Sequence, residues 1–140
     1  MRTAVAVVLF IPALCASAAP VPKASKEKEA AADLEKVQGK WERTLTDPMG
    51  QVLRYVKEHS GNSTTLTAFD STGRVVATRT SEFRVERQGS VRLFTYSTNG
   101  WKDHGSYVYK VEGDLFIEVS GILVDDAQPA GLIVWKRLKE

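Results

Sequence analysis

Cysteine is almost absent from this 140-residue chain. The single Cys15 allows no intrachain disulfide and no zinc site built from cysteines. An excess of one charge is also missing: 19 Lys and Arg face 17 Asp and Glu, for a formal net charge of +2. So small an excess gives no strong electrostatic argument for nucleic-acid binding. The composition, 43% hydrophobic and 26% charged, excludes a wholly disordered chain, and the length indicates one domain, with or without a tail.

No apolar run is long enough to cross a membrane as a helix, and the longest run lies at the start of the chain. A basic start, Met1-Arg2, precedes an apolar run over 3–14 and the small residues Ala16-Ser17-Ala18. This order is typical of a secretory signal peptide, and the run is shorter than the roughly 20 residues that a spanning helix needs. We therefore expect residues 1–18 to be removed near Ala18. The mature chain would be periplasmic, secreted or held at the cell envelope, without a stable membrane span, and bacterial export suits its lack of cysteine.

Residues 19–32 are predicted to form a flexible or helical lead-in to a domain over 33–140. Alanines and straight-chain charged residues favour a helix over 25–38. Within it Ala30, Leu34 and Val37 form a narrow apolar stripe, and Gly39 is a typical residue to follow a helix end. The stripe predicts a short helix that caps the domain, in preference to a helix that binds a partner.

From residue 40 onward the pattern is that of short strands separated by turn signals such as Asp-Pro-Met-Gly and Glu-Gly-Asp. No connection is long enough for a crossover helix, so neighbouring strands should be antiparallel. A closed barrel hides all strand edges, whereas a two-sheet sandwich hides only some. We therefore predict an all-β, up-and-down, eight-stranded barrel after a short N-terminal helix, with strands over 40–46, 51–58, 64–69, 74–86, 91–97, 107–111, 115–119 and 132–138.

The two ends of this strand region carry a family resemblance. Gly39-Lys40-Trp41 opens the first strand, and Trp135-Lys136-Arg137-Leu138 closes the last. The chain thus resembles lipocalin-like, calycin-type domains, and in outline the small exported ones of planctomycetes and related bacteria. The resemblance implies that Gly39, Trp41 and Arg137 close one end of the barrel, with the arginine beside the first-strand tryptophan. A guanidinium over an indole is worth about 0.5–2 kcal/mol.

An eight-stranded barrel is either filled by side chains or holds one small ligand. Strand alternation assigns the mainly apolar faces to the interior, including Leu115, Ile117 and Val119. Five polar or charged residues then interrupt the apolar wall and are the candidate ligand-binding residues: Arg43, Tyr55, Arg79, Tyr107 and Tyr109. They would suit an amphipathic or anionic small molecule. Alternatively, the arginines lie at the barrel mouths and reach water, and the protein is a protein-interaction or inhibitor module of the cell envelope with a filled barrel.

Catalysis finds little support in the sequence. No G-x-S-x-G motif is present, and both histidines, His59 and His104, are predicted to be solvated loop residues. A hydrolase-like activity is the enzyme alternative, and no catalytic residue, cofactor or metal is expected. An arginine-rich stretch, Arg74 to Arg92, contains Glu82 and Glu86, so cross-strand ion pairs explain it better than nucleic acid does. The oligomeric state stays open.

Overall fold

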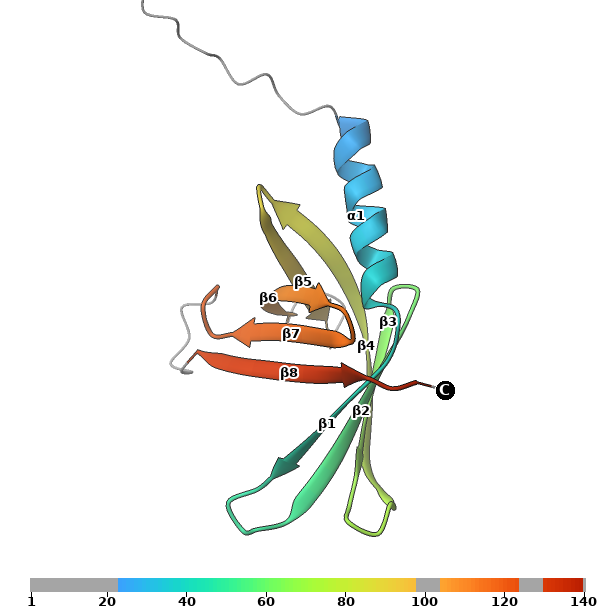
Figure 1. Cartoon of the computed structure of the whole chain (residues 1–140), viewed down its shortest axis with the longest axis vertical. Coiled ribbons are helices and arrows are strands. Elements are labelled where there is room, and N and C mark those ends of the chain that lie inside the picture. Colours follow the sequence, from blue (N-terminus) through green and yellow to red (C-terminus); the bar gives the residue numbers. More distant parts are fainter. Residues whose placement is uncertain (1–22, 98–103, 124–129, 140) are drawn as a thin grey trace, which may run out of the picture.

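The computed structural model describes residues 23–97, 104–123 and 130–139. The predicted signal peptide over 1–18 lies outside the described residues. Within these described residues, one helix precedes eight strands (Figure 1). Their bounds are α1 Lys23–Val37, β1 Gly39–Thr46, β2 Val52–Ser60, β3 Ser63–Phe69, β4 Val75–Gln88, β5 Val91–Ser97, β6 His104–Glu112, β7 Leu115–Ser120 and β8 Gly131–Arg137.

The strands form one closed barrel, in which each strand pairs antiparallel with the next and β8 returns to β1. The closing ladder is short. Trp41 lies opposite Arg137, Glu42 lies opposite Lys136, and the backbone NH of Leu138 donates to the carbonyl of Lys40 at 2.9 Å. The predicted fold class, an eight-stranded up-and-down barrel after a short helix, is therefore confirmed.

Two hairpins at the end of the barrel away from α1 use the same local chemistry (Figure 1). In the β1–β2 turn, Asp47 Oδ1 accepts from the backbone NH of Met49 and of Gln51, each at 2.8 Å. In the β3–β4 turn, Asp70 Oδ1 accepts from the backbone NH of Thr72 and of Arg74. Such aspartate turns fix the hairpin connections locally, which explains why the sequence predicts these strand ends well.

Helix α1 ends on the barrel, and side chains of the barrel bind its last carbonyl groups. Trp41 Nε1 and His59 Nδ1 both donate to the carbonyl of Val37 at 2.8 Å. Arg137 donates to the carbonyls of Lys36 and Gln38 at 3.0 and 2.9 Å. These bonds satisfy groups that a helix C-terminus otherwise leaves to water. The helix thus runs through the predicted domain boundary at residue 33 and closes one end of the barrel.

The core behind this closed end is aromatic and contains a histidine. Phe83 and Phe94 stack at a centroid separation of 4.8 Å, and the ring of His59 lies 4.9 to 5.5 Å from the rings of Phe83, Phe94 and Phe116. His59 is only 2% exposed and lies on β2. The prediction that it is a solvated loop residue is wrong. The side chain of His104 lies outside the described residues.

The predicted orientation of β7 is also wrong. Phe116 is 0% exposed and Glu118 is 2% exposed, whereas Leu115, Ile117 and Val119 are only half-buried. The inner face of β7 therefore carries one aromatic residue and one carboxylate. A count of apolar residues favours the other face, because the buried glutamate makes the inner face look polar.

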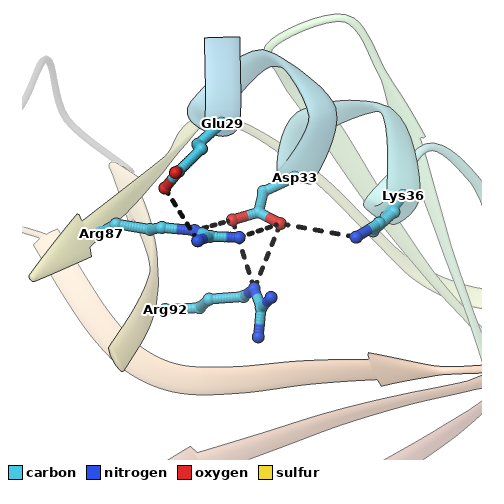
Figure 2. A network of polar contacts seen from close by, with 5 residues as sticks. All are labelled: Glu29, Asp33, Lys36, Arg87 and Arg92. Carbon is cyan, nitrogen blue, oxygen red and sulfur yellow. Dashed lines mark hydrogen bonds and ion pairs between the residues drawn. The ribbon is translucent and has the colours of Figure 1, made fainter. Parts of the chain in front are cut away.

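Part of the arginine-rich stretch binds α1. Asp33, 2% exposed on the helix, accepts hydrogen bonds from Arg87 and Arg92, and Arg87 also donates to Glu29 at 2.9 Å (Figure 2). Burial opposes ionisation of Asp33, but the bonds from the two arginines hold its pKa below the ordinary value. These pairs join the helix to β4 and β5, whereas the sequence suggested pairs between strands.

Replacing Asp33 with asparagine should lower the free energy of unfolding by about 1–2 kcal/mol, because two partly exposed arginines would lose the carboxylate that accepts their hydrogen bonds. Urea unfolding followed by far-UV circular dichroism measures the change. Glu29→Gln is the matched control, because it alters the exposed partner of the same Arg87 and should cost less. An equal loss in both variants would contradict a special role for the buried carboxylate.

Candidate functional site

A cavity of about 150 Å³ lies inside the barrel. Its residues come from all eight strands, so the closed fold itself brings them together. They are Arg43, Lys57, Thr64, Leu66, Arg79, Ser81, Phe94, Tyr96, Tyr107, Glu118, Ile133 and Trp135. An apolar cavity of roughly this volume can hold a benzene-sized molecule, so the space suits a compound of about one ring or a short chain.

Arg43 brings a positive charge to the cavity from β1. Its guanidinium carbon lies 4.6 Å from the Trp135 ring centroid and 5.6 Å from that of Tyr55. Its Nε is buried and makes no hydrogen bond within the described part of the chain. Burial lowers the pKa of Arg43, but an arginine stays protonated in proteins. The cavity therefore contains a buried cationic donor with an unmet hydrogen bond.

Lys57 and Glu118 form a second charged group in the same cavity. Lys57 Nζ lies 2.7 Å from Glu118 Oε2, and Trp135 Nε1 donates to that same oxygen at 2.7 Å. The side chains of Lys57 and Glu118 are 12% and 3% exposed. The ammonium also lies 4.4 Å from the Trp135 ring centroid. Glu118 thus neutralises Lys57, and the two cations are held on the ring of Trp135.

The charges of the cavity do not cancel. Arg43 and Lys57 supply two positive charges and Glu118 supplies one negative charge, while Arg79 adds an exposed guanidinium at the rim. A buried charge without a counter-charge is costly. An anionic ligand in the cavity would balance Arg43, whereas a cationic ligand would be repelled.

Neutral polar groups line the rest of the wall. The hydroxyls of Tyr96 and Tyr107 lie 2.9 Å apart on stacked rings. Burial, together with the hydrogen bond between the two hydroxyls, raises the pKa of Tyr107. Thr64 Oγ1 is buried and, among the described residues, has no hydrogen-bond partner. Thr64 and Arg43 therefore both present unused hydrogen-bonding capacity to the cavity.

The structure brings together three of the five predicted ligand residues, Arg43, Arg79 and Tyr107. Tyr55 contacts Arg43 but does not line the cavity. Tyr109 lies deeper, with its ring against Phe94 and Phe116, and burial raises its pKa to about 12. Sequence reasoning missed Lys57, Thr64, Glu118 and Trp135. Strand parity could have found Lys57, which lies two residues from Tyr55 on the same face of β2, whereas nothing in the sequence singled out Glu118.

The predicted closure residues meet at the end of the barrel that α1 covers. The guanidinium carbon of Arg137 lies 4.0 Å from the Trp41 ring centroid. Gly39 has φ of +97°, and a Cβ there would lie 3.2 Å from Arg137 Nη1. Glycine therefore gives the chain both its left-handed turn and space for the arginine. The Trp41–Arg137 contact that the resemblance implies is present.

The fold is an eight-stranded, all-antiparallel closed β-barrel, compatible with calycin-like folds. Comparisons with protein-family models, with curated proteins and with solved structures find no match to this chain. Within residues 23–97, 104–123 and 130–139, no group of three or more His, Cys, Asp or Glu side chains could hold a metal ion. No helix in the described part of the chain is long and apolar enough to cross a membrane.

Proposed function

We propose that this protein is an exported, lipocalin-like binding module that holds a small anionic or amphipathic molecule inside its barrel, without turnover. One observation carries the proposal: Arg43 Nε is buried beside the cavity and makes no hydrogen bond within the described residues. A carboxylate placed there would accept a charge-assisted bond and balance the excess positive charge. The apolar wall of Leu66, Phe94 and Ile133 would contact the rest of the ligand.

Benzoate should bind at least about tenfold more tightly than its neutral analogue benzamide, because a hydrogen bond to a charged group contributes about 1.5–3 kcal/mol. Trp135 lines the cavity, so its fluorescence can follow the titration, with calorimetry as a second measurement. Arg43→Gln should remove the preference for benzoate. Arg84→Gln makes the same charge change at an exposed position on β4 and should leave binding unchanged.

Equal affinity for benzoate and benzamide in the unmodified protein would argue against an anion site. Binding of neither compound, together with no thermal shift across a set of short-chain and aromatic carboxylates, would remove the proposal. The protein-interaction module with a filled barrel would then be the favoured function.

A further inference from the structure

Lys57 is a buried primary amine beside the cavity, and holding an anion does not by itself require it. Its side chain is 12% exposed, and its ammonium is in contact with a carboxylate, Glu118, that can exchange protons with it. Arg43 lies over the same Trp135 ring as the ammonium, at 4.6 Å against 4.4 Å. One small cavity thus contains an amine, a proton acceptor and a carboxylate-binding cation.

We infer that Lys57 captures small 2-oxo monocarboxylates as a reversible imine, with the ligand carboxylate on Arg43 and Glu118 transferring the protons. This inference rests on the proposed anion site, because Arg43 has to hold the carboxylate while the adjacent carbonyl carbon meets Lys57 Nζ. Arg43 and Lys57 lie beside the same Trp135 ring, and a 2-oxo acid carries its carboxylate and its carbonyl group on adjacent carbon atoms, so one small ligand has a partner for each cation.

The chemistry balances within the cavity. Glu118 first takes a proton from the Lys57 ammonium, and the neutral amine forms a C–N bond to the carbonyl carbon as the C=O π bond opens. Glu118 returns its proton to the new alkoxide and then takes one from the nitrogen, which gives a carbinolamine. Its proton finally goes to the hydroxyl, the C–O bond breaks, and water leaves as the C=N bond forms. The product is a protonated imine beside the Glu118 carboxylate, and no oxidant or reductant is needed.

The surroundings of Lys57 favour the neutral amine that this reaction needs. Burial lowers the pKa of Lys57, and although Glu118 acts in the opposite direction, the nearby charge of Arg43 lowers it further. A desolvated lysine near another cation is the usual form of an amine nucleophile in proteins. Lys110, by contrast, is an exposed lysine paired with the exposed Glu112.

Reductive trapping tests the inference. The full mature protein is incubated with pyruvate and sodium cyanoborohydride, and modified lysines are located by peptide mass spectrometry. We expect one saturable adduct on Lys57 that forms much faster than any on Lys110. Lactate, which has the same carboxylate but no carbonyl, should give no adduct and should compete with pyruvate. Arg43→Gln should slow the modification of Lys57 about tenfold or more, as expected from loss of a charge-assisted bond.

Lys57→Arg is the matched variant, because it keeps a cation beside Glu118 but has no primary amine, and it should lose the adduct. Modification of Lys57 no faster than that of Lys110 in the unmodified protein would overturn the inference, whether or not the variant folds. If benzoate and lactate bind but pyruvate leaves Lys57 unmodified, the imine is excluded and the anion site stands. If neither benzoate nor lactate binds, both proposals fail.

Discussion

Replacing Lys57 with methionine should lower the free energy of unfolding by about 3–5 kcal/mol, because it leaves the Glu118 carboxylate buried without its cation. Glu118 would keep only the bond from Trp135 Nε1. The unbranched methionine side chain can occupy the space of the lysine. It would pack against the rings of Phe94, Phe116 and Trp135, which the ammonium faces in the unmodified protein. The loss would therefore come from the unpaired charge, not from a cavity. Urea unfolding at pH 7, followed by tryptophan fluorescence, measures it.

The double variant Lys57→Met with Glu118→Gln should recover most of that stability. The glutamine carbonyl can still accept from Trp135 Nε1, and no buried charge is left without a partner, apart from Arg43. Replacing buried ion pairs with neutral residues is often free of net cost. Lys110→Met, which breaks the exposed pair with Glu112, serves as the control and should change stability little. Equal effects of the two single lysine variants would show that the Lys57–Glu118 pair is not effectively buried.

Strand positions and barrel closure were the part of the structure that the sequence could predict. Turn residues mark the hairpins directly, as Asp47 and Asp70 show through their bonds to the following backbone NH groups. Closure was predictable for another reason: in an up-and-down barrel the first and last strands must meet. Topology therefore predicted that the first and last strands meet, and the family resemblance added the contact of Arg137 with Trp41, which is present.

The charged interior could not be predicted in the same way. Glu118 is buried because Lys57 on β2 and Trp135 on β8 donate hydrogen bonds to it. The alternation of residues within β7 gives no information about these partners on other strands. Asp33 is similar, since its two arginines lie 54 and 59 residues away along the chain. Hydrophobic alternation identifies faces well only where the buried face is apolar. A buried polar network inverts the signal, as it did on β7.

His59 could have been placed more accurately by parity alone, because it continues the inward series Tyr55 and Lys57 along β2. Its surroundings have a consequence for acid stability. Burial, and secondly the charge of Lys57, lowers the pKa of His59 to about 3, although its bond to the carbonyl of Val37 acts in the opposite direction. In the unfolded chain the ordinary value is about 6.5.

The unfolded chain therefore binds a proton at His59 at a pH where the folded protein does not, so the folded state loses stability as the pH falls. Above about pH 7 the His59 imidazole is neutral in both states, so it costs the folded state no stability. The stability declines below pH 6.5, by about 2 kcal/mol between pH 8 and pH 5 and by about 4 kcal/mol at pH 3. Carboxylates whose pKa the folded structure lowers, such as Asp33, add to the loss only at the acid end. The stability lost between pH 6.5 and pH 5 therefore comes mainly from protonation of histidine.

His59→Phe should flatten this acid response while leaving stability at pH 8 nearly unchanged. The new ring can pack among Phe83, Phe94 and Phe116, and the carbonyl of Val37 keeps its bond from Trp41 Nε1. The variant also removes His59 Nε2, a buried nitrogen without a hydrogen-bond partner among the described residues. Urea unfolding at pH 8, 6.5 and 5 measures the effect, and His104→Gln isolates the contribution of the other histidine. If His59→Phe and the unmodified protein lose equal stability between pH 8 and pH 5, His59 is protonated in the folded state and its burial does not control acid unfolding.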